Sequence, residues 1–149
     1  MLIALDQETI DKNAHRLSEN GLIIADADFN PTVPSDAPGD LLVVPLSEIA
    51  SSEGLKIMRN VAALGASAYL MNIPLSEFEI ALKRQFAQKE EVWAPNIAVL
   101  HKAYEYVKEH HPVRDGFELP APLGNTISQN GSNDEGALFI TGNEAFAMG

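Results

Sequence analysis

Acidic side chains follow two short apolar runs of this sequence. Asp26 and Asp28 come directly after Leu22 to Ala25, and Asp6 follows Leu2 to Leu5. We interpret both runs as buried strands, and ligands of open α/β sheets bind beyond the carboxyl ends of strands. Paired carboxylates there can hold a metal ion or a ribose hydroxyl. The chain has no glycine-rich turn to contact nucleotide phosphates, so solvated turn or capping residues are the simpler interpretation.

Three of the four histidines lie close together in the chain, at His101, His110 and His111. Metal ligands on one helix face usually sit three or four residues apart, whereas these spacings are nine and one. The sequence therefore predicts no metal site. His110 and His111 suit the last turn of a helix, where a cation interacts favourably with the helix dipole.

A further candidate lies near the end of the sequence, where the apolar run 137–141 precedes Gly142, Asn143 and Glu144. A strand, a turn and a helix in this order can receive an anionic group. We keep these three residues as candidates for cofactor binding, with a plain turn as the alternative. We identify no catalytic residue.

Charge and composition exclude several classes of protein. The 149-residue chain has a formal net charge of −11, and an acidic surface disfavours nucleic-acid binding. It has no cysteine, so it can hold neither a thiolate zinc site nor a cysteine-ligated iron–sulfur cluster. No run approaches the ~20 apolar residues that cross a bilayer. The start does not resemble a signal peptide, and we expect a cytoplasmic protein.

The elements that would position these groups alternate along the first half of the chain. A helix is expected from Glu8 to Glu19, ended by a left-handed Asn20-Gly21. Together with the two strands it forms a β-α-β unit, which predicts parallel pairing. Asn30 to Gly39 is a proline-rich loop, Leu41 to Val44 is a third strand, and Ser47 is expected to cap a short helix.

Three consecutive helices are predicted after the third strand. The first runs from Val61 to Met71, with Asn60 as its N-cap. Ser76 and Glu79 form a capping box at the start of the second helix. Pro95 is expected to open the third helix.

The first of these helices is apolar on every face and consists mainly of small residues. Such a helix must be covered on all sides, and we expect a chain of this length not to enclose it alone. Small side chains let another backbone approach closely, so we predict subunit contacts at Asn60, Ala63, Gly65 and Ser67. An ordinary core helix beneath the sheet is the alternative. Both interpretations hold if opposite faces pack on different partners.

The block NVAALGASAYLMNIPLSEFEIALKRQF, with ALDQETIDKNAHRL before it and NIAVLHKAYEYV after it, resembles the gamma-type domain of 2-oxoacid:ferredoxin oxidoreductases. The tail ALFITGNEAFAMG resembles the junction with the alpha-type domain in fused alpha subunits. This resemblance divides the chain into a partial gamma-type domain (1–111), a linking arm (112–136) and the start of an alpha-type domain (137–149).

The resemblance implies a Rossmann-like three-layer α/β fold with a mostly parallel sheet. It implies a complex that oxidises a 2-oxoacid such as 2-oxoglutarate to its acyl-CoA and passes electrons to ferredoxin. Thiamine diphosphate, coenzyme A and iron–sulfur clusters would belong to the complex, and none is expected to be bound by this chain alone. The implied partners are a beta-type thiamine-binding subunit, ferredoxin and further small subunits.

The sequence departs from that family at its start, because the glycine-rich strand-turn-helix unit that normally opens the gamma-type domain does not occur. We therefore interpret the chain as a fragment and expect it to be inactive when isolated. Two other functions stay open at this point. One is a non-catalytic α/β assembly or binding module, and the other is a small nucleotide-binding α/β enzyme.

Overall fold

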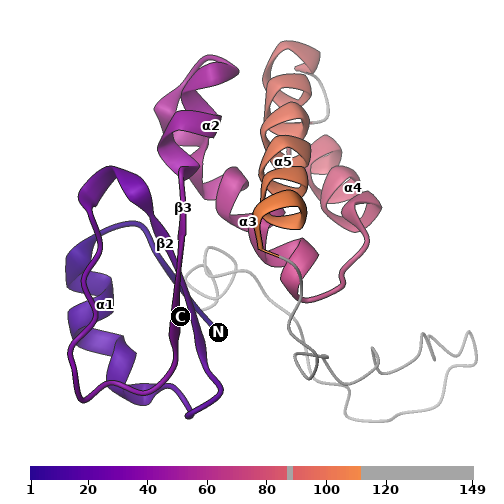
Figure 1. Cartoon of the computed structure of the whole chain (residues 1–149). Coiled ribbons are helices and arrows are strands. Elements are labelled where there is room, and N and C mark those ends of the chain that lie inside the picture. The colour runs from indigo at the N-terminus through magenta and orange to yellow at the C-terminus, as the bar shows by residue number, and fades with distance from the viewer. Residues whose placement is uncertain (87–88, 112–149) are drawn as a thin grey trace, which may run out of the picture. The chain divides into compact units, whose positions relative to one another are not determined.

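The computed structural model describes residues 1–86 and 89–111. Its strands are β1 (Leu2–Ala4), β2 (Leu22–Asp26) and β3 (Asp40–Val44). They form one parallel sheet in the order β1-β2-β3 (Figure 1). In its centre, Ile24 of β2 pairs with Ile3 of β1 and with Leu42 of β3. The three predicted strands and their parallel direction are confirmed.

Helices make up most of the remaining described chain. They are α1 (Gln7–Asn13), α2 (Leu46–Ser52), α3 (Arg59–Leu70), α4 (Leu75–Gln85) and α5 (Glu90–His110). Short 3-10 turns are η1 (Ala14–Arg16), η2 (Ala27–Phe29) and η3 (Lys56–Met58). No helix within residues 1–86 and 89–111 is long and apolar enough to span a membrane.

Side chains alternate between the two faces along each strand. The strands carry apolar side chains on both faces, and helices cover both. On one face, Ile23 packs with Ile10 of α1. On the other, Ile24 and Val44 belong to a core that α2, α3 and α5 complete. Figure 1 shows α1 on one side of the strands and these three helices on the other. The three-layer α/β fold is therefore confirmed.

Helix α3 crosses α5 at very short range. Gly65 makes this possible, because a Cβ atom there would lie 2.1 Å from the carbonyl oxygen of Leu100. Ala62 and Ala66 of α3 are fully buried in the same core. The expectation that this chain does not enclose α3 is wrong for most of the helix, because its small side chains let α5 cover them directly.

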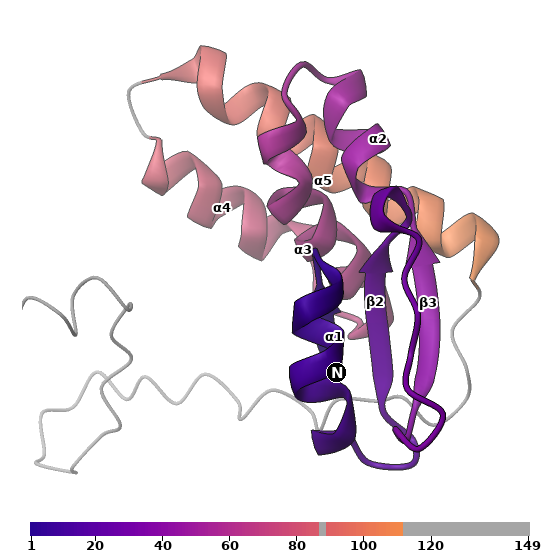
Figure 2. The ribbon, with the colours of Figure 1, turned by 90° about the vertical axis from the view of Figure 1, so that its left-hand side faces the viewer.

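Helix α4 packs beside α5 and away from the strands (Figure 2). None of its residues is fully buried, although its apolar residues Phe78 and Leu82 are half-buried. The carboxylate of Glu79 accepts a hydrogen bond of 2.7 Å from His101 of α5. Helix α4 thus has few buried apolar contacts, and its contact with α5 includes a polar pair at the surface. Both features indicate that it is held less firmly than α3 and α5.

Four predicted helix starts are wrong by two to five residues. Helix α3 continues from η3, so Asn60 lies inside it and caps nothing. Pro74 takes the N-cap position of α4, and no capping box forms between Ser76 and Glu79. Helix α5 begins at Glu90 and carries Pro95 inside it. Helix α2 begins at Leu46, with Pro45 at its cap position.

The end of the first helix also differs from the prediction. Helix α1 stops at Asn13, and η1 passes into extended backbone at Leu17. Asn20-Gly21 is not left-handed; among the described residues other than glycine, positive φ angles occur at Asn30 and Asn72. Gly21 is instead fitted into a tight space, because an added Cβ would lie 2.8 Å from the Ser18 carbonyl oxygen.

Candidate functional site at the carboxyl edge of the sheet

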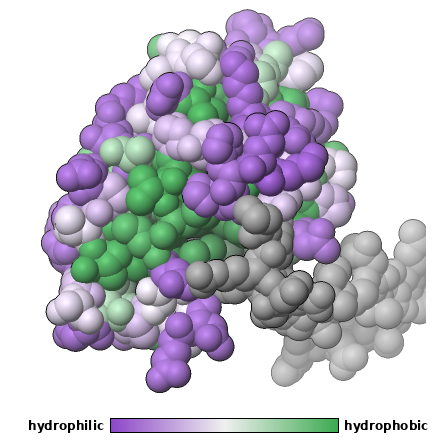
Figure 3. Space-filling view, viewed as in Figure 1, coloured by the Kyte–Doolittle hydropathy of each residue, from purple (hydrophilic) through white to green (hydrophobic). Residues whose placement is uncertain are grey.

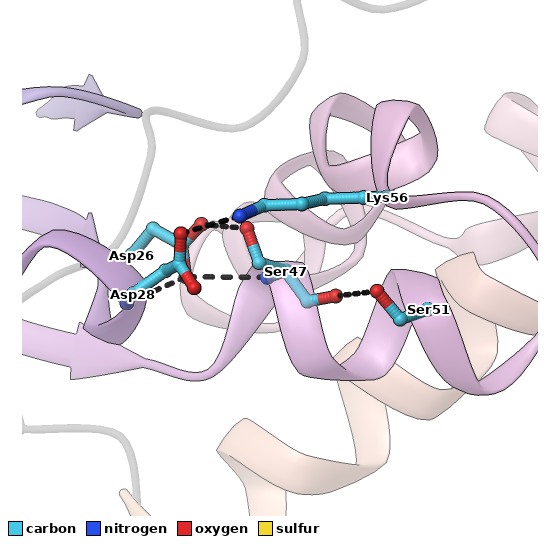
Figure 4. A network of polar contacts seen from close by, with 5 residues as sticks. All are labelled: Asp26, Asp28, Ser47, Ser51 and Lys56. Carbon is cyan, nitrogen blue, oxygen red and sulfur yellow. Dashed lines mark hydrogen bonds and ion pairs between the residues drawn. The ribbon is translucent and has the colours of Figure 1, made fainter.

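Asp26 ends β2 and ties the sheet to the start of α2 (Figure 4). Its side chain is fully buried. One carboxylate oxygen accepts the Ser47 backbone N–H at 3.2 Å, and the other accepts the Ser47 hydroxyl at 2.5 Å. The interpretation of Asp26 as a solvated turn residue is therefore wrong, but the alternative of a capping residue is confirmed, because its carboxylate also accepts the Asp28 N–H at the start of η2. Burial of this carboxylate is compensated by the donors that Ser47 provides.

Asp28 and Asp6 match the simpler interpretation. Asp28 is exposed in η2, and its carboxylate pairs with the Lys56 ammonium at 2.6 Å (Figure 4). Asp6 caps α1 by accepting hydrogen bonds from the Thr9 N–H and hydroxyl. These bonds hold the pKa of Asp6 below its usual range. Both residues thus act as capping or surface residues.

This arrangement leaves little room for metal or nucleotide chemistry at Asp26. Both of its oxygens already accept hydrogen bonds, and one also accepts the Asp28 N–H. Within the described ranges, no group of three histidine, aspartate or glutamate side chains is placed to hold a metal ion. The network instead fixes the angle between β2 and α2 and positions η3 through Lys56.

A hollow of about 460 Å³ lies next to this network, at the carboxyl end of β3. Its lining combines apolar side chains with one carboxylate, and consists of Ala27, Val43, Pro45, Glu48, Ile49, Ser52 and Tyr106. Tyr106 comes from α5, where its ring stacks on His110 with centroids 4.2 Å apart. The carboxyl ends of parallel strands are where open α/β sheets bind their ligands.

The predicted subunit-contact residues of α3 have two different environments. Ala63, Gly65 and Ser67 are buried within this chain, whereas Asn60 is exposed. Their contact with another subunit stays a prediction. Gly142, Asn143 and Glu144 lie outside the described residues, as do the predicted arm and the predicted start of a second domain.

The histidines do not form a cluster. His101 donates to Glu79, and His110 donates from Nδ1 to the Tyr106 carbonyl oxygen one turn earlier. Burial and the neighbouring His110 lower the pKa of His111. Trp93 lies inside α5, with the Lys83 ammonium 5.5 Å from its ring centroid.

Sequence reasoning missed two charged residues of this edge. Lys56 reaches Asp28 across 28 positions of the chain, and Glu48 lines the hollow beside Val43. No motif marks either residue. For Glu48 the available signal is its position shortly after the third strand, where side chains of an α/β sheet converge. Lys56 follows α2 and carries no such signal.

Comparisons with known proteins agree with this geometry. Residues 1–106 match the family model described as pyruvate ferredoxin/flavodoxin oxidoreductase. Subunit alpha of 2-oxoacid:ferredoxin oxidoreductase 2 from Aeropyrum pernix is 29% identical over 107 residues, which are 70% of this chain and 15% of that protein.

Two solved structures share the fold. The 2-oxoglutarate:ferredoxin oxidoreductase from Magnetococcus marinus, solved with 2-oxoglutarate, coenzyme A and succinyl-CoA bound, has a TM-score of 0.63 and 24% identity, over 75% of this chain and 21% of that chain. The gamma subunit of keto/oxoacid ferredoxin oxidoreductase from Geobacter sulfurreducens PCA has a TM-score of 0.61 and 25% identity, over 72% of this chain and 63% of that chain.

The chain spans less than two thirds of the length of each of these relatives. The family match itself covers well over half of the 149 residues and reaches from β1 into α5. On this basis, the chain belongs to the pyruvate ferredoxin/flavodoxin oxidoreductase family.

Proposed function

We propose that this chain is the gamma-type part of a cytoplasmic 2-oxoacid:ferredoxin oxidoreductase and that it serves the assembly of that enzyme on its coenzyme A side. The observation that carries the proposal is the family match over residues 1–106, which includes the whole sheet and α1 to α4. The complex would oxidise a 2-oxoacid such as 2-oxoglutarate to its acyl-CoA and reduce ferredoxin.

The described residues do not fit direct binding of coenzyme A at the carboxyl edge. The phosphates of coenzyme A require cations or free backbone N–H groups. Lys56 at this edge already pairs with Asp28, and Lys102 beside the hollow pairs with Glu53. Glu48 adds a further negative charge at the adjoining hollow. We therefore assign no coenzyme A contact to this edge. Thiamine diphosphate and the iron–sulfur clusters belong, in this proposal, to other parts of the complex.

An assembly role agrees with the chemistry of the described side chains. Asp26, a buried carboxylate of the edge, is engaged in structural hydrogen bonds with Ser47 and Asp28 and has no exposed surface. The strands and helices instead build a rigid layer whose core is packed by small residues of α3 and by α5. A layer of this kind presents surfaces to neighbouring subunits.

A co-expression experiment tests the proposal. The tagged full chain is produced with a beta-type thiamine-binding subunit and purified, and reduction of ferredoxin by 2-oxoglutarate and coenzyme A is measured. We expect the beta-type subunit to co-purify, and we expect activity only when every part of the complex is present. Failure of the beta-type subunit to co-purify would contradict the proposal.

A non-catalytic binding module is the second candidate, because the described part of the carboxyl edge has no phosphate-binding turn, and Asp6, Asp26 and Asp28 are engaged in capping bonds or an ion pair. Under this alternative the chain would bind a protein unrelated to oxidoreductases. Identification by mass spectrometry of the proteins retained in the same purification separates the two functions.

A further inference from the structure

Strand β3 lies at an edge of the sheet, because within the described residues it pairs with β2 alone. Its Leu41 and Val43 point to the same face and are 36% and 39% exposed. On that face α1 covers Ile23 and Ala25 of β2, and Val33 and Ala37 of the segment before β3 pack against the same cluster, whereas Leu41 and Val43 stay partly open. Figure 3 shows apolar side chains gathered over the strands in this view. An apolar strand edge of this kind is a template for pairing with another chain.

The hollow at the carboxyl end of β3 continues this edge. Val43 belongs to both, and Ile49 and Tyr106 extend the apolar lining. Glu48 supplies the carboxylate of the lining, is exposed, and makes no ion pair with any residue in the described part of the chain. An apolar wall beside an unpaired carboxylate suits a long basic side chain, whose methylene stem packs while its charge reaches the carboxylate.

We propose that the edge of β3 and the adjoining hollow form the docking surface for an extended, basic segment of another subunit of the same oxidoreductase. The segment pairs with β3 as an added strand, and its alternate side chains cover Leu41 and Val43. A lysine or arginine of the segment enters the hollow, lies against Tyr106 and pairs with Glu48. A second copy of this chain is disfavoured as the occupant, because each copy carries a net charge of −11.

This inference rests on the proposed function for the identity of the partner, but the surface can be tested without that partner. The probe is a fluorescein-labelled peptide of alternating valine and polar residues with a central arginine. The matched probe carries glutamate in place of that arginine. We expect the full chain to bind the arginine peptide at least tenfold more tightly, in fluorescence anisotropy at low salt.

Three variants locate the binding surface. Glu48→Lys should reverse the preference between the two peptides, and Val43→Asp should abolish binding of both. Ile80→Asp, at an exposed apolar position of α4, should leave binding unchanged. Circular dichroism checks that each variant folds; should Val43→Asp unfold the chain, the exposed Glu48→Lys still decides the question. Equal binding of the two peptides, or an unchanged preference in Glu48→Lys, would overturn the inference.

The co-expressed complex separates this inference from the proposed function. If the wild-type chain retains the beta-type subunit and Glu48→Lys retains it equally well, the docking surface is wrong and the proposed function survives. If the wild-type chain retains no oxidoreductase subunit but keeps its peptide preference, the proposed function fails and the surface stands. Loss of the partner in Glu48→Lys but not in Ile80→Asp supports both.

Discussion

Replacing Gly65 by alanine tests the contact between α3 and α5 that closes the core. The new Cβ would lie 2.1 Å from the Leu100 carbonyl oxygen and 3.2 Å from the Ala103 Cβ. Carbon–oxygen contacts settle near ~3.3 Å, so the two helices must separate by about 1 Å. A gap of that size forfeits about a quarter to a half of the local dispersion energy, and overpacking a core costs about 1–3 kcal/mol.

An opposing effect reduces this cost. Alanine is a better helix former than glycine by about 1 kcal/mol. Because the obstructing atom belongs to the backbone of α5 and cannot rotate away, we take the upper end of the overpacking range. The net prediction for Gly65→Ala is a loss of about 2 kcal/mol in the free energy of unfolding. Urea denaturation, monitored by the circular dichroism of the peptide groups, measures this loss.

Asn60→Ala is the matched control, because Asn60 lies in the same helix and is exposed. An exposed substitution of this kind should change the free energy of unfolding by no more than about 0.5 kcal/mol. If Gly65→Ala is as stable as Asn60→Ala, the helices do not cross at Gly65 as described, and the account of how the chain encloses α3 is refuted.

Further predictions concern the polar contacts. Ser47→Ala should lower the free energy of unfolding by about 1–3 kcal/mol, because the buried Asp26 loses a donor. In urea titrations, the double variant Ser47→Ala/Asp26→Asn should lose less free energy than the two single variants added together. Strictly additive losses would argue against the hydrogen bond between Ser47 and Asp26. Hydrogen bonds from Thr9 lower the pKa of Asp6 below its ordinary value of 3.8. The ionised cap therefore stabilises the fold fully above pH 3.8, and this stabilisation is lost as the pH falls through the lowered pKa of the folded state. The difference in Tm between wild type and Asp6→Asn should therefore be largest near neutral pH and shrink on acidification; a difference that is constant from pH 7 to 2 would contradict this. Glu79→Gln should leave the stability within about 1 kcal/mol but speed hydrogen exchange in α4, since its bond to His101 is weakened; unchanged exchange would show that this contact does not hold α4.

Strand positions and direction were predictable because buried parallel strands are short, continuous apolar runs. Residues 22–25 and 41–44 are of this type, and both lie within observed strands. The β-α-β order then required parallel pairing. The helix starts were less predictable, because capping motifs are only local signals. Ser76 and Glu79 match a capping box in sequence, yet the backbone enters α4 through Pro74 and both residues lie inside the helix.

The ends of the strands at the carboxyl edge were predictable, but the contacts of the side chains there were not. The carboxyl ends of the first two strands were correctly marked by Asp6 and Asp26, since strand ends are visible in the sequence. That Asp26 is buried against Ser47, 21 positions away, depends on how α2 packs on the sheet. Such long-range contacts leave no periodic pattern. The exposed edge of β3 was missed for the same reason, because the burial of Leu41 and Val43 depends on which segments pack on their face of the sheet.

The mass of the particle that contains this chain is the measurement that tests the central claim most directly. The tagged chain, co-expressed with a beta-type thiamine-binding subunit, is purified and examined by size-exclusion chromatography with light scattering. We predict a particle that contains both subunits and is far heavier than the 16.1 kDa chain. Elution of the chain at 16.1 kDa, with the thiamine-binding subunit in a separate peak, would contradict its assignment as an assembly part of a 2-oxoacid:ferredoxin oxidoreductase.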